Sequence, residues 1–283
     1  MPYLLLALDL VINGINSIAR KNYSLRFNGK GVYFFNAVAI LFSILFFLIS
    51  AGGNLHFSWP LLPYAIIFGI CFGLCNIATL SAINYGPLAL TSLFVSYSTL
   101  IPTIHGFFLG ERPNLKLFIP GLALFMLSLL LTNKPTKGEK ISGKWLFYVL
   151  LAVVTNAGCS ISQTQQQVDF HEQYGNELMI LALTIAEVFY IIMMLLTERK
   201  ELATLFKGGW YNPPISGIAN GANNYLVMLL RPMLGATILF PLISGGGLLI
   251  SLLLSLFIFK EKLSKLQMVG FFVGLGAVIL LSL

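Results

Sequence analysis

Three ionisable side chains lie inside long apolar stretches of this sequence: Asp9, His105 and Glu187. A charged group is costly in hydrocarbon, so such residues face a cavity or a partner and often mark ion or proton pathways. No Lys or Arg lies deep in the same stretches, so neither acid has an obvious cationic partner. We therefore expect Asp9, Glu187 and His105 to be the candidate proton-coupling residues.

Each of these residues also has a simpler interpretation. Asp9 lies near the start of its stretch and could stay solvated at a membrane surface. Glu187 could face hydrocarbon as a neutral, protonated packing residue. His105 could titrate near neutral pH, although a lone histidine on a helix is more often structural. The sequence leaves these alternatives open.

Amide side chains recur at helical spacing in the apolar stretches. Asn13 and Asn16 follow Asp9 by four and seven residues, which puts all three on one face of a helix. Matching positions of later stretches carry Asn76, Asn156, Asn223 and Asn224. Lipid cannot satisfy an amide, so we expect these asparagines to line a shared cavity that binds substrate. Hydrogen bonding between neighbouring helices is the alternative.

Tyr97 is the remaining candidate for substrate binding. It precedes Ser98, Thr99 and Pro102 in one apolar stretch, and a glycine run at 245–247 marks another. Proline frees a backbone carbonyl and glycine lets the backbone approach a ligand, so both stretches are expected to bend near a site. Close packing through small residues explains the pattern equally well.

The composition indicates the class of protein that must position these side chains. Of 283 residues, 57% are hydrophobic and only 10% are charged, whereas soluble domains carry about 25% charged residues. Apolar runs recur that are long enough to cross ~30 Å of hydrocarbon. We therefore predict an all-α polytopic membrane protein. Its net charge of +7 needs no nucleic acid, because basic loops orient membrane proteins and meet anionic lipid.

Neither a metal site nor an enzymatic motif is expected. The three cysteines lie inside apolar stretches, where an odd number of thiols argues against a disulfide framework and against metal binding. No phosphate-binding loop, metalloprotease motif or nucleophile elbow is found in the sequence. We expect no cofactor and no enzymatic activity.

Ten spans are expected along the chain, in two halves. The predicted spans are 3–20, 31–50, 60–83, 88–109, 116–132, 144–166, 175–196, 210–230, 235–259 and 266–283. The hydrophilic segment 134–143 is the predicted linker between a first repeat, 1–133, and a second repeat, 144–283. Five spans per half is an odd number, so the second half enters the membrane from the opposite side as an inverted repeat.

A charged turn with an acid recurs in both halves. Gly110-Glu111 ends one apolar helix and Lys260-Glu261 ends another, and a glycine-bearing apolar helix follows each. We expect Glu111 and Glu261 to cap helices or to neutralise basic neighbours in these turns. Together with the segments GPLALTSL (86–93) and LIPT (100–103), the two units resemble the EamA-type transporters of the drug/metabolite transporter superfamily.

The resemblance covers nearly the whole chain and implies a ten-helix secondary transporter with a central cavity between its halves. The expected function is movement of a small neutral or zwitterionic solute, amino-acid-like or drug-like, across the plasma membrane by alternating access. Proton coupling and uniport are both compatible with the sequence. The expected partners are the solute, membrane lipid and protons, and the chain would act as a monomer or homodimer. The alternative is a non-transporting membrane protein, such as a lipid-handling or accessory subunit.

The basic residues predict an orientation. One set of loops holds fourteen of them and the other holds only Arg112, Lys116 and Arg231. The richer set is expected in the cytoplasm, which puts both termini outside. This orientation differs from the one that the resemblance implies, in which the termini lie inside.

Overall fold

The computed structural model describes residues 2–27, 30–85, 95, 97–132, 143–258 and 265–282. In these segments the chain is helical apart from turns and short loops, and it forms no strand. The predicted all-α fold is confirmed for this part of the chain. The 86–93 segment, the linker 134–142 and Glu261 lie outside the described residues.

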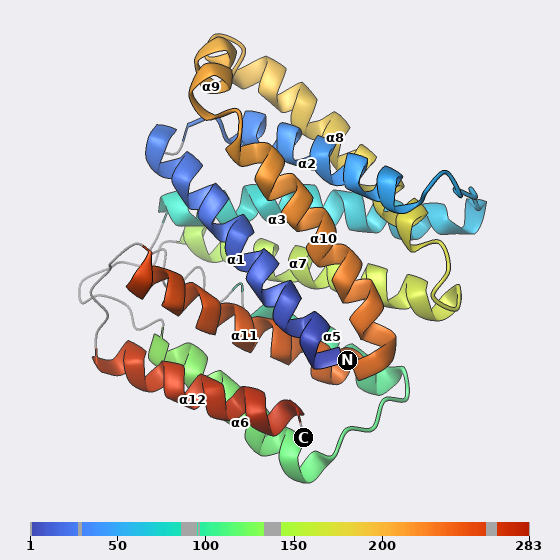
Figure 1. Ribbon diagram of the computed structural model, residues 1–283, viewed down its shortest axis with the longest axis vertical. Helices are drawn as coiled ribbons and strands as arrows, with labels where there is room; N and C mark the ends of the chain where they lie inside the picture. The colour runs from blue at the N-terminus through green and yellow to red at the C-terminus, as the bar shows by residue number, and fades with distance from the viewer. Residues whose placement is uncertain are drawn as a thin grey trace. The chain divides into compact units, whose positions relative to one another are not determined.

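Every described helix except α9 overlaps a predicted span (Figure 1). Of the predicted span 88–109, only residue 95 and residues 97–109 are described. In chain order they are α1 (Pro2–Phe27), α2 (Val32–Ser50), the 3-10 turn η1 (Trp59–Leu61), α3 (Leu62–Tyr85), η2 (Tyr97–Thr99), α5 (Leu100–Phe108), α6 (Leu115–Thr132), α7 (Gly143–Asp169), α8 (Gly175–Thr197), α9 (Leu202–Gly209), α10 (Asn212–Leu234), α11 (Ala236–Phe257) and α12 (Lys265–Ser282).

Two features differ from the sequence-based prediction. Helix α1 continues past the predicted end at residue 20, and the short helix α9 was not expected. Both follow from packing, because Tyr23 of α1 and Leu205 of α9 are buried in one cluster with Phe34 and Phe35 of α2. An eight-residue helix is too short to be stable alone, so tertiary contacts are needed to hold it.

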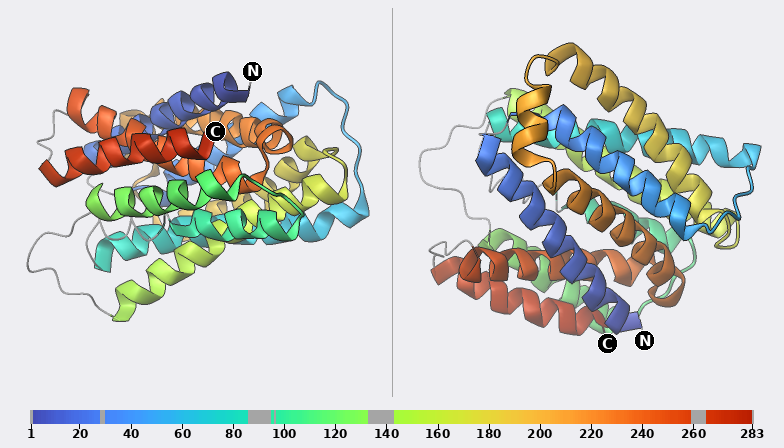
Figure 2. Two further views of the ribbon diagram at one scale, coloured as in Figure 1. Left: turned by 90° about the horizontal axis from the view of Figure 1, so that it is seen from below. Right: turned by 45° about the horizontal axis from the view of Figure 1, so that its top comes forward.

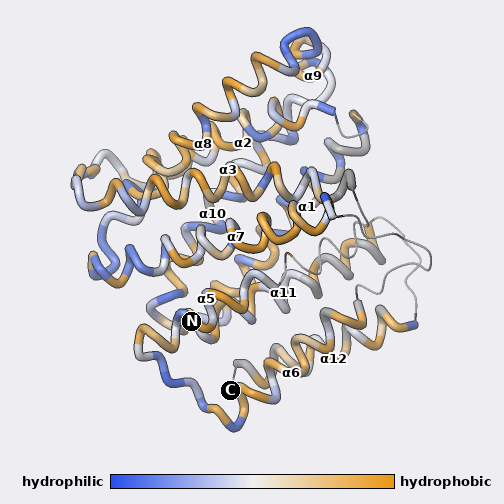
Figure 3. Tube along the Cα trace, turned by 180° about the vertical axis from the view of Figure 1, so that it is seen from behind, coloured by the Kyte–Doolittle hydropathy of each residue, from blue (hydrophilic) through white to orange (hydrophobic). Residues whose placement is uncertain are grey.

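Within the described residues, five helices are long and apolar enough to cross a membrane, as judged by length and composition: Pro2–Arg20, Val32–Ser50, Trp59–Thr79, Gly143–Asp169 and Gly175–Thr197. Large apolar side chains on such helices are exposed, among them Leu4 at 75% and Ile49 at 80%. Hydrophilic residues gather in the turns between helices (Figure 3). Apolar exterior surface together with buried polar side chains is the pattern of a protein that spans a membrane.

The chain forms two compact units. One comprises Tyr3–Gly73 and Ser162–Leu229, and the other comprises Leu74–Ile161 and Leu230–Leu283. Each unit therefore takes segments from both sides of the predicted linker, and neither coincides with a predicted repeat. Helices α3, α7 and α10 each contribute to both units.

In the first unit α2 packs along α8. Helix α10 also lies against α2, where a methyl group built on Gly217 would overlap the backbone oxygen of Ala39. Ser43 of α2 donates to the carbonyl of Gly217 at 2.7 Å. Glycine is required at this position because the two backbones approach too closely for a side chain.

In the second unit α6 packs along α12, and α5 packs against α11 (Figure 2). Ser128 of α6 donates to the carbonyl of Gly270 in α12 at 2.8 Å. Pro102 lies in the first turn of α5, directly after η2. Proline is tolerated there because the first N–H groups of a helix have no intrahelical acceptor.

Candidate functional site

A polar seam joins α1 and α10 in the first unit. Asp9 Oδ1 accepts a hydrogen bond from Asn223 Nδ2 at 2.7 Å, and Asn16 Oδ1 accepts one from Ser216 Oγ at 2.6 Å. From Asp9 to Asn16 the residue number rises by seven on α1, while from Asn223 to Ser216 it falls by seven on α10. The two helices therefore run antiparallel, and the two pairs are about 10 Å apart along them. We call these four residues and Asn13 the α1–α10 polar seam.

Asp9 is the least satisfied member of this seam. Its side chain is fully buried, and its second oxygen, Oδ2, has no hydrogen-bond partner in the described part of the chain. An ionised Oδ2 needs a donor and a protonated one needs an acceptor, so the site is incomplete in either protonation state. A buried polar atom without a partner costs about 1–3 kcal/mol. Asp9 Oδ2 is therefore a buried oxygen with unused hydrogen-bonding capacity.

The two remaining predicted amides of α1 and α10, Asn13 and Asn224, differ in their contacts. Asn224 Nδ2 donates to the carbonyl of Asn220, one turn earlier, at 2.9 Å. The side chain of Asn13 is half-buried and makes no hydrogen bond within the described residues. Four of the seven predicted substrate-binding residues, Asn13, Asn16, Asn223 and Asn224, thus lie on these two helices.

Two glutamines of α7 bind the backbone of α10. Gln163 Nε2 donates to the carbonyl of Asn224 at 3.4 Å, and Gln167 Nε2 donates to that of Met228 at 2.7 Å. Pro232 lies four residues after Met228 and has no N–H, so the Met228 carbonyl lacks its intrahelical donor. Gln167 supplies that donor. Its role is therefore structural, which the amide spacing alone did not reveal.

The three other predicted substrate-binding residues belong to the second unit. Asn156 of α7 donates to Ser98 Oγ at 2.6 Å. Asn76 is half-buried in α3. Tyr97 lies in η2, and its side chain is outside the described part of the structure. Asn156 and Ser98 therefore form a polar contact between α7 and η2, directly before α5.

The other two predicted coupling residues are separate from Asp9 in the sequence and in their contacts. Glu187 lies in the middle of α8 at 9% exposure, and its Oε2 has no partner among the described residues. His105 belongs to α5, and its buried Nδ1 has no hydrogen-bond partner among the described residues. Glu187 thus shares with Asp9 the feature of a buried, incompletely bonded carboxyl group.

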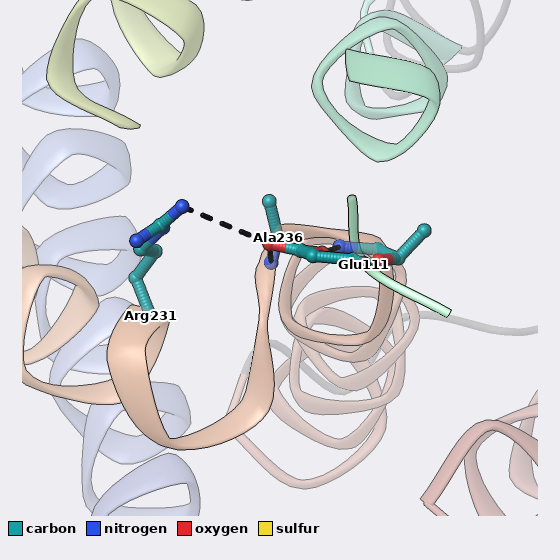
Figure 4. Close-up of polar contacts among 4 residues, drawn as sticks. Glu111, Arg231 and Ala236 are labelled. Atoms are coloured by element: carbon teal, nitrogen blue, oxygen red, sulfur yellow. Dashed lines mark hydrogen bonds and ion pairs between the residues drawn. The ribbon is translucent and has the colours of Figure 1, made fainter. Parts of the chain in front are cut away.

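Glu111 caps a helix, as expected, but its partners lie far from its own turn (Figure 4). Its carboxylate accepts hydrogen bonds from the backbone N–H groups of Ala236 at 2.8 Å and Thr237 at 2.7 Å, and also from the Thr237 hydroxyl. Arg231 Nη2 lies 3.8 Å from the same carboxylate. Glu111 therefore caps the positive start of α11, 125 residues further along the chain, rather than a neighbour in its own turn.

Glu198 makes a similar cap in the first unit. It follows α8 and accepts from the backbone N–H groups of Tyr33 at 3.0 Å and Phe34 at 2.7 Å, at the start of α2. Each capped helix follows a glycine with positive φ, Gly31 at 72° and Gly235 at 74°. The hydroxyl of Tyr23 lies near this cap and donates to the carbonyl of Gly31. Burial raises the pKa of Tyr23, and the negative charge of the Glu198 carboxylate raises it further.

The structure also contains an apolar groove of about 510 Å³, lined by Phe42, Leu45, Phe46, Ile49, Ser50 and Ile218. None of the predicted site residues lines it. Among the described residues, no group of three or more His, Cys, Asp or Glu side chains is arranged to hold a metal ion.

Comparisons with known proteins show the fold. No protein-family model matches the chain. No curated protein matches it either. Among 29 matching chains of solved structures, one crystal structure, described only as that of a protein, aligns with a TM-score of 0.71. The alignment covers 99% of this chain and 95% of the other at 13% sequence identity. The two proteins therefore share a fold, and the likeness carries no activity across.

Proposed function

We propose that this chain is a secondary transporter of a small organic solute in the plasma membrane, with ten spans arranged as two inverted repeats of the EamA type. The observation that carries the proposal is Asp9. It is a fully buried carboxyl group in an apolar span, with one oxygen bonded to Asn223 and the other unpartnered. An incompletely bonded acid inside a membrane span marks a proton or solute pathway.

The packing of the helices supports the inverted repeat. Counting spans from the N-terminus, α2 and α8 are second and seventh, α5 and α11 fourth and ninth, and α6 and α12 fifth and tenth. Each of these pairs packs together within its own unit. Two five-span repeats related by a two-fold axis would bring equivalent spans together in this way.

The carboxylate caps support the same arrangement. Glu111 follows the fourth span and caps the ninth, and Glu198 follows the seventh span and caps the second. Both therefore connect spans at equivalent positions of the two halves. In this arrangement the acidic turn at Glu111 joins equivalent spans of the two repeats.

In the proposed cycle, the solute binds the amides of the α1–α10 polar seam, and the halves rock about it. Asp9 takes up a proton or the cationic group of the solute in one state and releases it in the other. Glu187 is the second group able to carry a proton, since its Oε2 is also unpartnered. A neutral or zwitterionic solute fits the amides of the seam.

The test is solute flux with simultaneous pH recording in proteoliposomes, using an amino-acid, sugar and cationic-drug panel. We expect Asp9→Asn to lower flux at least about tenfold and Glu172→Gln, an exposed loop control, to leave it unchanged. Loss of the pH signal in Glu187→Gln alone would make Glu187 the coupling group. Unchanged flux in both Asp9→Asn and Glu187→Gln contradicts coupling by these acids. Lipid scrambling without solute flux would instead support the lipid-handling alternative.

A further inference from the structure

Basic side chains from three helices gather at one end of the first unit. Lys30 lies two residues before α2, while Arg199 and Lys200 lie just after α8. Arg26 of α1 borders α9, because a methyl group built on Gly208 would lie 3.7 Å from Arg26 Nε. Since these residues flank the ends of candidate membrane spans, we expect this end of the unit to lie at the level of a membrane surface.

The two acids at this end already have partners within the protein. Glu198 accepts the two N–H groups at the start of α2, and Glu201 pairs with Lys30 at 3.4 Å. Arg26, Arg199 and Lys200 are exposed and make no hydrogen bond or ion pair with described residues. A net positive surface with no internal counterion remains.

Helix α9 adds aromatic side chains to this surface. Leu205 and Gly209 of α9 are buried against α1 and α2, whereas Phe206 is 61% exposed and Trp210 is 60% exposed. Lys207 is exposed beside them. The helix runs across the direction of α8 rather than continuing it (Figures 1 and 2). A short helix with one apolar side, exposed Trp and Lys, and this direction is suited to lie in the lipid headgroup layer.

We propose that Arg26, Arg199, Lys200, Lys207 and Trp210 form a binding surface for an anionic phospholipid headgroup. Lys and Arg donate to phosphate oxygens, and the exposed rings enter the boundary between headgroups and acyl chains. A soluble anion would gain nothing from the exposed Phe206 and Trp210 rings, which is why the surface favours a lipid. The inference is independent of what the chain transports.

The three tryptophans of the chain provide the assay. Trp210 belongs to the proposed surface, and Trp59 is 74% exposed at the opposite end of α2, where 51–58 carries no Lys or Arg. Trp145 is 1% exposed and contributes an unquenched background. The full chain is reconstituted in phosphatidylcholine with either brominated phosphatidylglycerol or brominated phosphatidylcholine as quencher. Trp210→Phe and Trp59→Phe subtractions assign the quenched signal to each residue.

We expect brominated phosphatidylglycerol to quench Trp210 more than brominated phosphatidylcholine does, with no such preference at Trp59. Removing charge with Arg199→Gln, Lys200→Gln and Lys207→Gln together should lower the preference at least about fivefold. The control Arg112→Gln with Lys116→Gln should leave it unchanged, because Arg112 in the turn before α6 and Lys116 in the first turn of α6 are exposed basic residues outside the proposed surface. Unchanged Trp59 quenching shows that the variants are folded.

Three results would overturn the proposal. Equal quenching of Trp210 by the two lipids, or a preference that survives the triple substitution, means that no headgroup site exists here. Inorganic phosphate is the third probe, compared with chloride at equal ionic strength. If phosphate abolishes the preference and chloride does not, the surface binds free anions and the assignment to a lipid is wrong.

Discussion

Removing the Glu111 carboxylate should destabilise the protein, because the backbone N–H groups of Ala236 and Thr237 at the start of α11 would lose their acceptor. The carboxylate accepts from two backbone N–H groups at 2.8 and 2.7 Å, and its side chain is only 18% exposed. Charge-assisted hydrogen bonds contribute roughly 1.5 kcal/mol each or more, so Glu111→Ala should lower the free energy of unfolding by about 3 kcal/mol. Glu111→Gln keeps one acceptor oxygen and should cost about half as much.

The ion pair with Arg231 should matter less than the cap. Its atoms are 3.8 Å apart, which is beyond hydrogen-bonding distance, and the Arg231 side chain remains 13% exposed. Partly solvated pairs of this kind contribute about 0.5–1 kcal/mol. Arg231→Met should therefore cost clearly less than Glu111→Ala.

The assay is reversible unfolding in mixed micelles of mild detergent and dodecyl sulfate, followed by circular dichroism, with Glu172→Ala as an exposed acidic control. The expected order of cost is Glu111→Ala, then Glu111→Gln, then Arg231→Met. A Glu111→Ala variant that stays within about 0.5 kcal/mol of the parent would refute the capping argument. An Arg231→Met variant that costs as much as Glu111→Ala would show that the ion pair, and not the helix start, is the main interaction.

Two further predictions concern helix packing. Gln167→Leu should lower the free energy of unfolding by about 1–3 kcal/mol, because the Met228 carbonyl, which Pro232 leaves without an intrahelical donor, then has no donor at all. Adding Pro232→Ala restores the backbone N–H and should recover most of that loss. A double variant no more stable than Gln167→Leu in the same unfolding assay would contradict this explanation. Gly217→Ala should strongly destabilise the protein because the added methyl group would overlap the Ala39 carbonyl oxygen. The control Gly73→Ala should unfold like the parent, because a methyl group there would lie 3.9 Å from its nearest neighbour, a ring carbon of Phe189. Equal stability of the two variants would show that α2 and α10 are less closely packed than described.

Local patterns in the sequence determined where the helices form and that their exteriors are apolar enough for a membrane. Long apolar runs specify membrane-compatible helices because the hydrophobicity of a span depends only on its own residues. The spacing of Asp9, Asn13 and Asn16 likewise specified a shared helical face through the 3.6-residue period. In an apolar span, each of those polar groups needs a hydrogen-bond partner wherever the helix packs.

The tertiary structure decided which partner each polar group has. Asp9 meets Asn223, Glu111 reaches α11, and Gln167 binds a carbonyl freed by Pro232, all across 61 to 214 residues of chain. No local spacing encodes such contacts, because they depend on how separate helices pack. Local sequence does not predict α9 for the same reason. Its eight residues form a stable helix only when Leu205 is buried against α1 and α2. The sequence determined which side chains required a partner, and only helix packing decided where those partners came from.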